Sequence, residues 1–93
     1  MTNSGTFTKT LKIRNKFGIH ARPAALIVKT SNKFTAKIML EKDGNTASGN
    51  SIIGLLTLEG SPGSKVKVTA SGADAAEALS SIEELFKNNF LED

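Results

Sequence analysis

The chain has 93 residues, a single histidine, and no cysteine, tryptophan or tyrosine. This length supports one domain with one modest core, and it is too short for a Rossmann unit plus a second domain or for a TIM barrel. The absence of cysteine excludes disulfides and cysteine zinc sites, and one histidine cannot form a multi-histidine metal centre. We therefore expect neither a metal nor another cofactor.

The charge is unevenly distributed along the chain. Residues 1–40 contain eight Lys and Arg and no Asp or Glu, whereas residues 41–93 contain four Lys and nine Asp or Glu. The two balances, +8 and −5, give the net charge of +3. A basic half of this length indicates an acidic partner or a phosphate.

No segment approaches the roughly 18 consecutive apolar residues of a membrane span. The N-terminus is polar and lacks the apolar stretch of a secretion signal. We therefore expect a cytoplasmic protein that does not insert into a membrane. Residues 1–5 are interpreted as a flexible lead-in to a single domain over residues 1–93.

The first half of the chain predicts two strands that flank a helix, followed by a hairpin. Apolar and polar residues alternate over about 7–14 and again over 34–41, as in half-buried strands. Between them, an apolar stripe at helical spacing predicts a helix over about 21–33. Asp43-Gly44 predicts a type I′ turn, which needs positive φ at both central residues, and a short antiparallel strand over about 45–49 follows it.

The second half predicts a helix, a strand and a last helix. Ser51 is a favoured N-cap, and with Gly60 as the stop it favours a helix of about two turns over 51–58. Alternation over 66–70 predicts a fourth strand, and an apolar stripe over about 74–88 predicts the last helix. The order βαββαβα predicts an α+β fold with a four-stranded antiparallel sheet and three helices packed on one face.

The segment that joins the first strand to the first helix has the most unusual chemistry. Gly18 permits a bend, and Pro23 is acceptable only in the first turn of a helix, so His20 falls at or beside the N-cap. Unpaired backbone N–H groups, expected from Ala21 and Arg22, and the helix dipole favour an anion there. Arg22 adds a guanidinium that suits phosphate oxygens. The sequence therefore predicts an anion site at His20.

The same position has consequences for the His20 ring. A helix N-terminus disfavours imidazolium, so we expect a neutral, nucleophilic imidazole near neutral pH. No carboxylate lies within residues 1–40, which argues against a hydrolase. Lys29 and Lys33, on the same predicted helix, are expected to enlarge a positive collar around the site. The alternative is that His20 is only a polar cap, the common role of a lone histidine at a helix start.

Two segments resemble motifs of a known family. Gly18-Ile19-His20-Ala21-Arg22-Pro23-Ala24 resembles the active-site signature of HPr, the histidine-containing phosphocarrier family of the bacterial phosphoenolpyruvate-dependent sugar phosphotransferase system. The resemblance extends over about residues 6–89, and the element order is similar to the family's open-faced β-sandwich. Asn50-Ser51-Ile52-Ile53-Gly54-Leu55-Leu56 resembles the family's regulatory-serine helix, with Asn50 where lysine is common.

The resemblance implies a monomeric phosphoryl carrier that is not a stand-alone catalyst. His20 would accept a phosphoryl group on Nδ1 from phosphorylated enzyme I, which takes it from phosphoenolpyruvate, and would pass it to a histidine of an EIIA domain. Arg22 would neutralise the phosphoryl charge during transfer. Ser51 would be phosphorylated by HPr kinase/phosphorylase with ATP. The alternative for Ser51 is a structural N-cap, worth roughly 1 kcal/mol.

The resemblance also implies a docking surface around the site. Near His20, this surface would include Phe17 and Ala21. The regulatory-serine segment adds Ile53, Leu55 and Leu56. Phe17 stands where many family members have a small polar residue, which bears on the choice of partner.

Two other functions stay open from the sequence. A relative that serves a nitrogen-type phosphotransfer chain, or that acts only through Ser51, would have the same motifs. A small nucleic-acid-binding domain would fit the sequence pI near 9.4 and the element order. However, the strand aromatics Phe7 and Phe34 lie on faces that should point into the core, so we expect no nucleic acid partner.

Overall fold

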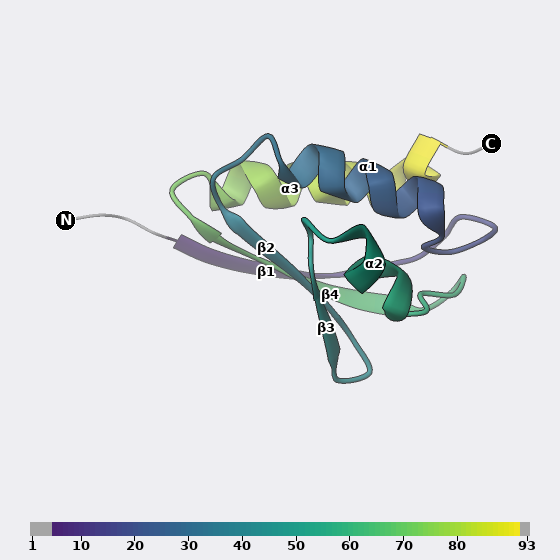
Figure 1. Cartoon of the computed structure of the whole chain (residues 1–93). Coiled ribbons are helices and arrows are strands. Elements are labelled where there is room, and N and C mark those ends of the chain that lie inside the picture. Colours follow the sequence, from purple (N-terminus) through teal and green to yellow (C-terminus); the bar gives the residue numbers. More distant parts are fainter. Residues whose placement is uncertain (1–4, 92–93) are drawn as a thin grey trace.

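Strands and helices follow one another in the predicted order. The computed structural model describes residues 5–91 (Figure 1). Its elements are β1 (Gly5–Lys12), α1 (Ala21–Ser31), β2 (Lys37–Lys42), β3 (Asn45–Ser48), α2 (Ile52–Thr57), β4 (Lys65–Gly72), α3 (Ala75–Lys87) and a short helical turn, η1 (Asn89–Leu91). This confirms the βαββαβα order and the α+β fold class.

The strands form one antiparallel sheet in the order β1-β4-β2-β3, so β1 and β3 are its edges. The helices lie on one face of this sheet (Figure 1). Leu11 of β1 pairs with Val66 of β4, and Leu40 of β2 pairs with Val68 on one side and Ala47 on the other. The register therefore gathers the buried residues of all four strands on the helix side, and the alternate residues form the opposite face.

The core lies between the sheet and the helices. α3 supplies a stripe of buried residues at helical spacing, and its Phe86 ring contacts the Phe90 ring of η1 at 4.8 Å between centroids. Phe86 and Phe90 are therefore core residues. The largest fully buried side chains come from every layer of the fold: Ile13, Ile27, Ile38, Leu40, Leu55, Val66, Val68, Ile82 and Phe90.

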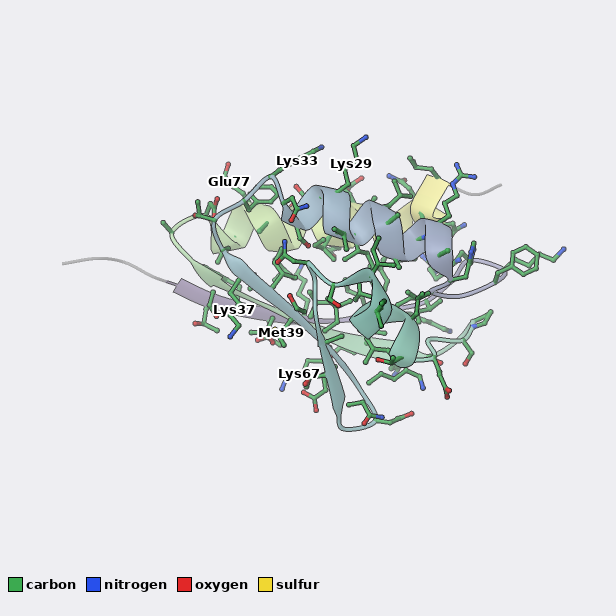
Figure 2. All side chains as sticks on the ribbon, in the orientation of Figure 1. Lys29, Lys33, Lys37, Met39, Lys67 and Glu77 are labelled. Carbon is green, nitrogen blue, oxygen red and sulfur yellow. The ribbon has the colours of Figure 1, made fainter. Side chains whose placement is uncertain are left out.

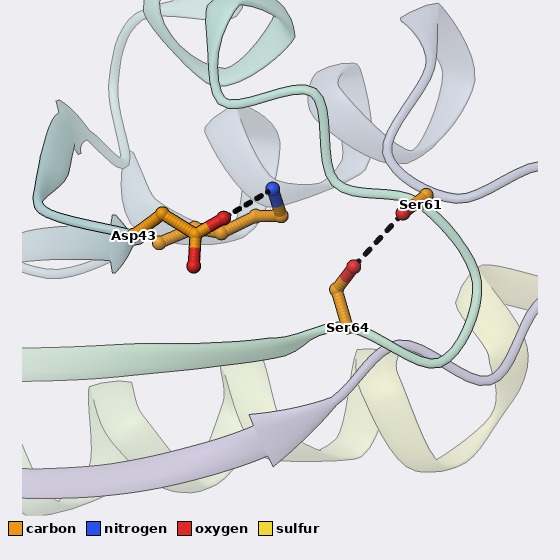
Figure 3. Close-up of polar contacts among 4 residues, drawn as sticks. Asp43, Ser61 and Ser64 are labelled. Carbon is orange, nitrogen blue, oxygen red and sulfur yellow. Dashed lines mark hydrogen bonds and ion pairs between the residues drawn. The ribbon is translucent and has the colours of Figure 1, made fainter.

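Two turns have short polar contacts (Figure 3). Asp43 and Gly44 have φ of 52° and 84°, which confirms the type I′ turn, and the Asp43 carboxylate lies 3.0 Å from the ammonium of Lys42. In the loop after α2, the hydroxyls of Ser61 and Ser64 lie 2.9 Å apart. This second loop lies against the residue after β1, because the Gly63 N–H donates to the Ile13 carbonyl at 2.7 Å and the Ile13 N–H donates to the Ser64 carbonyl at 2.8 Å.

Two predictions about the N-terminal strand are wrong. Phe7 was expected in the core, but its side chain is 45% exposed. It lies on the helix side of β1, yet β1 is an edge strand, and its residues before Leu11 are not enclosed. Gly5, assigned to the lead-in, is the first residue of β1, while residues 1–4 lie outside the described part of the chain.

The end of α2 also differs from the prediction. The helix ends at Thr57, and the residue in the left-handed conformation is Glu59, with φ of 52°, rather than Gly60. Gly60 is buried instead, and a Cβ there would lie 2.7 Å from Ile13 Cδ1. The glycine is needed for close packing against the core, not to stop the helix.

The Asp74 carboxylate joins the start of α3 to the segment before β2. It accepts hydrogen bonds from the Thr35 N–H at 2.9 Å, the Ala36 N–H at 2.8 Å and the Thr35 hydroxyl at 3.2 Å. These bonds, led by that of the Thr35 N–H, favour the charged form and lower the pKa of Asp74 against the opposing effect of partial burial. The ionised carboxylate therefore stabilises the native state.

We predict that Asp74→Asn lowers the melting temperature by several degrees at neutral pH, because an amide cannot accept all three hydrogen bonds. The pKa of Asp74 is depressed in the folded state, so its contribution is present above about pH 4, the usual carboxyl range, and is lost as the pH falls through the depressed value. Thermal melts of both proteins across this range should therefore converge at acid pH. Asp43→Asn, at an exposed turn position that tolerates asparagine, is the control and should change little.

Candidate functional site

The loop between β1 and α1 turns sharply at Gly18, which has φ of 69°. The next N–H, that of Ile19, donates to the carbonyl of Gly60 at 2.8 Å. A Cβ on Gly18 would lie 2.0 Å from the Gly60 oxygen, so no other residue fits without moving the loop. The buried Asn15 side chain donates to the Gly18 carbonyl at 2.7 Å. The loop is thus held from both sides.

His20 is the N-cap residue of α1, as predicted. Its backbone is extended, and its carbonyl accepts the Ala24 N–H at 3.0 Å. Pro23 is the third residue of the helix and is buried. The imidazole makes no capping hydrogen bond to the helix. The interpretation of His20 as a plain polar cap therefore does not describe its side chain.

The start of α1 supplies backbone donors beside His20. The first N–H groups of a helix have no acceptor within the helix. Pro23 has no N–H, so those of Ala21 and Arg22 remain, as the sequence predicts. The first turn contains no acidic residue, and the Ala21 and Arg22 side chains are exposed. Two amides, the helix dipole and a guanidinium at the same end of an eleven-residue helix form an environment that favours an anion.

Phe17 and Lys16 extend this environment on the other side of His20. The Phe17 ring is 67% exposed and meets the imidazole edge-on, with centroids 5.9 Å apart and an interplanar angle of 87°. The Lys16 ammonium lies 5.5 Å from the centroid of the Phe17 ring. Lys16 and Asn15 belong to no motif that pointed to the site from the sequence. Their position just before the glycine bend was the only sequence signal for either.

The predicted positive collar does not include the lysines of α1. Lys29 lies in the last turn of the helix, and Lys33 lies beyond its end. At 1.5 Å per residue, the nine residues from His20 to Lys29 span about 13 Å. Figure 2 shows Lys29 and Lys33 projecting from the helix layer toward its far end. The cations close to His20 in the chain are instead Lys16 and Arg22.

Ser51 is the N-cap of α2, as predicted. Its hydroxyl is half-buried and accepts the Gly54 N–H at 3.0 Å. The preceding Asn50 side chain donates to the side chain of Asn32, the C-cap residue of α1. A structural capping role for Ser51 is therefore present, and the segment is tied to the first helix.

The apolar residues of α2 divide between the core and the surface. Leu55 is fully buried, so its predicted docking role is wrong: the short helix rests on the core through this residue. Ile53 is 76% exposed, and Leu56 is also exposed. Ile52, which was not among the predicted docking residues, is exposed as well, four residues before Leu56 and on the same side of the helix. We call Ile52, Ile53 and Leu56 the apolar face of α2.

Within residues 5–91, no three His, Cys, Asp or Glu side chains gather in a way that could hold a metal ion. No helix in this range is long and apolar enough to cross a bilayer.

Comparisons with known proteins agree with this geometry. A family model described as the PTS HPr component phosphorylation site matches residues 7–88. The chain is 42% identical over 85 residues to the phosphocarrier protein HPr of Treponema pallidum, which covers 91% of this chain and 97% of that protein. It is 39% identical over 89 residues to the phosphocarrier protein NPr of Escherichia coli K12, covering 95% and 99%. A crystal structure of HPr from Thermoanaerobacter tengcongensis matches with a TM-score of 0.89 and 41% identity, covering 94% of this chain and 98% of that one.

We predict that Gly18→Ala destabilises the fold by more than about 1 kcal/mol, because it adds a steric clash with Gly60 to the cost of a left-handed alanine. Gly63→Ala is a matched control in the neighbouring loop. Gly63 also has positive φ, but a Cβ there would meet nothing within 4 Å. Urea unfolding of both variants separates the two costs. Equal losses of stability would contradict the close contact between Gly18 and Gly60.

Proposed function

The chain belongs to the HPr family and is a phosphocarrier of the phosphotransferase system, and on this basis we propose that His20 carries the phosphoryl group. The donor is phosphorylated enzyme I, which takes the group from phosphoenolpyruvate, and the acceptors are EIIA domains that serve sugar uptake. We place the carrier in the cytoplasm as a monomer. The observation that supports this proposal best is the position of His20 at the N-cap of α1, beside two backbone donors and Arg22.

The transfer chemistry follows from this position. The lone pair of the His20 Nδ1 attacks the phosphorus of the donor, forming a P–N bond as the donor's own bond to phosphorus breaks, while the imidazole proton stays on Nε2. The backbone N–H groups of Ala21 and Arg22 then donate hydrogen bonds to the phosphoryl oxygens and stabilise their negative charge. Arg22 adds a cation that screens the same oxygens during transfer in either direction. None of these groups makes the P–N bond inert, so the phosphoryl group can leave again.

Partner docking is proposed for the exposed apolar residues around the site. Phe17 and Ala21 flank His20 in the chain. The apolar face of α2 lies on the helix just before the loop in which the Gly60 carbonyl accepts the Ile19 N–H. Exposed apolar residues close to a polar reactive group are typical of a protein–protein interface. Phe17 and Ile53, the most exposed of them, are expected to bury the largest areas on binding.

Regulation through Ser51 is proposed beside its capping role. A phosphate there would add about −1.5 to −2 charges next to the apolar face of α2. At a helix start, this charge does not unfold the helix. It would instead repel an acidic docking partner. Phosphorylation of Ser51 by HPr kinase/phosphorylase with ATP would therefore act as an electrostatic switch.

The nitrogen-type branch is the second candidate function. The chain is similar to the phosphocarrier protein NPr of Escherichia coli as well as to HPr proteins. The two branches use the same chemistry at the histidine and differ in the acceptor. Transfer from the phosphorylated chain to a sugar-specific EIIA domain, compared with a nitrogen-type one, therefore decides between them.

We predict that His20→Ala abolishes phosphorylation by enzyme I and phosphoenolpyruvate. The wild-type product should be acid-labile and alkali-stable, as expected of phosphohistidine. Arg22→Gln should slow transfer by about tenfold or more, the scale of one charge-assisted hydrogen bond. Arg14→Gln removes the same charge from an exposed position on the other side of Gly18 and should change the rate little. Phosphorylation of His20→Ala under the same conditions would contradict the assignment of the site.

For Ser51 we predict that Ser51→Asp keeps the helix cap but slows transfer from enzyme I by about tenfold at low ionic strength, because it adds a negative charge at the docking surface. Ser80→Asp adds the same charge on the exposed side of α3 and is the control. Ser51→Ala should lose about 1 kcal/mol of stability with the cap and should no longer be phosphorylated with ATP and kinase. Phosphorylation of Ser51→Ala by the kinase and ATP would contradict the assignment of Ser51 as the regulatory site.

A further inference from the structure

The sheet face opposite the helices carries a concentration of lysines. Residues alternate between the two faces of a strand, so the neighbours of the buried Leu11, Ile38 and Val66 point away from the helices. Figure 2 shows Lys37 and Lys67 directed to this side, together with Met39. We define the basic sheet face by its four lysines: Lys12 of β1, Lys37 of β2, and Lys65 and Lys67 of β4.

The lysines of this face outnumber its carboxylates by four to one. Its strand residues include one carboxylate, that of Glu41, opposite Lys67 in the register. Lys12 lies directly opposite Lys65 across the β1–β4 pair. Residues paired in this way lie about 5 Å apart, and like charges there destabilise a sheet. Because the pairing of Lys12 with Lys65 is unfavourable to the fold, an anion outside the molecule explains these lysines better.

The remainder of the face indicates the kind of anion. Between the lysines lie small hydroxyl groups that pair across the strands, Thr8 with Thr69 at 3.2 Å and Thr6 with Ser71 at 3.3 Å. The open-face positions of the four strands hold no aromatic residue and no arginine. Tight protein partners use such anchors, and single-stranded nucleic acids need aromatic stacking. A layer of ammonium groups on a sheet surface instead complements an extended anionic surface.

We propose that the basic sheet face binds electrostatically to the surface of an anionic lipid bilayer. The ammonium groups would lie at the level of the lipid headgroups, and no part of the chain would enter the hydrocarbon region. In this orientation the helix layer, which contains the start of α1 and the apolar face of α2, faces away from the bilayer (Figure 1). The carrier would then keep His20 accessible while it is held weakly at the membrane.

The expected strength follows from the number of lysines. Each basic residue near an anionic leaflet strengthens binding by about fivefold. The attraction falls off within a Debye length of the surface, and added salt shortens that length. Four lysines therefore give weak and reversible binding, which suits a carrier that must leave again. The binding should need anionic lipid and should disappear at high ionic strength.

The test is sedimentation of the full chain with vesicles of phosphatidylcholine, with and without phosphatidylserine, at low ionic strength. Lys65→Gln with Lys67→Gln should weaken binding to the phosphatidylserine vesicles by about 25-fold. Lys29→Gln with Lys33→Gln, in the helix layer, makes the same change in net charge, from +3 to +1, and should weaken it by less than about twofold. Thermal melts should show that the sheet variant folds with a stability close to that of wild type, because it loses both the repulsion between Lys12 and Lys65 and the attraction between Lys67 and Glu41.

Three results would overturn the proposal. These are no binding of the wild type to phosphatidylserine vesicles, equal losses for the two double variants, and binding to a single-stranded oligonucleotide through the same lysines at least as strong as binding to vesicles. If the sheet variant proved unfolded, Lys12→Gln with Lys37→Gln would test the same face from the other two strands, with the same expected loss. None of these readouts depends on His20, so the proposed phosphoryl transfer can stand or fail independently.

Discussion

The contact between Gly18 and Gly60 controls the arrangement of the whole site. It brings together two loops that are more than forty residues apart in the sequence, and it leaves no room for a side chain on Gly18. The Ile19 N–H bonds to the Gly60 carbonyl, and Ile19 itself is buried in the core. Because the chain is fixed at this point, α1 must begin at Ala21, and His20 must occupy the N-cap. The same contact holds the loop after α2 against the segment that leads into His20.

The basic first half of the sequence does not form one basic side of the folded molecule. Of the basic residues in the first forty, Lys16 and Arg22 lie near His20, whereas Lys9 pairs with Glu83 of α3 at 2.8 Å. That pairing lowers the pKa of Glu83. Other lysines of the basic half, such as Lys12, join lysines of the acidic half on the sheet. The molecule thus has a helix layer that contains His20 and a separate basic surface on the sheet.

Because the two groups of cations lie on separate faces, they attract different binding partners. Cations close to the site can speed encounters with acidic docking surfaces without adding much to affinity. Cations on the opposite face cannot contribute to those contacts, but they can hold the molecule near an anionic surface while the site stays open. If the basic sheet face binds a bilayer as proposed, both effects operate in the same molecule.

Much of the fold was predictable because its signals are local. The alternation of apolar residues gave the strands, Asp43-Gly44 gave the hairpin, and Pro23 placed the start of α1 and therefore His20 at its N-cap. The errors arose where burial depends on distant parts of the chain. Phe7 fits the alternation but lies on an edge strand that leaves it open, and Leu55 lies in a six-residue helix too short for its apolar run to show which side faces the core. The roles of Gly60 and Asn15 depend on contacts between loops, which no local pattern reveals.

The central claim is that a phosphoryl group on His20 is held by the first backbone amides of α1. The most direct measurement is a ¹H–¹⁵N correlation spectrum of the chain before and after phosphorylation with enzyme I and phosphoenolpyruvate, with ³¹P coupling used to identify the modified nitrogen. The account predicts phosphorylation at Nδ1 and the largest downfield shifts at the Ala21 and Arg22 amides, with small changes along β2 and β3. Phosphorylation at Nε2, or unchanged Ala21 and Arg22 amides in the phosphorylated protein, would contradict it.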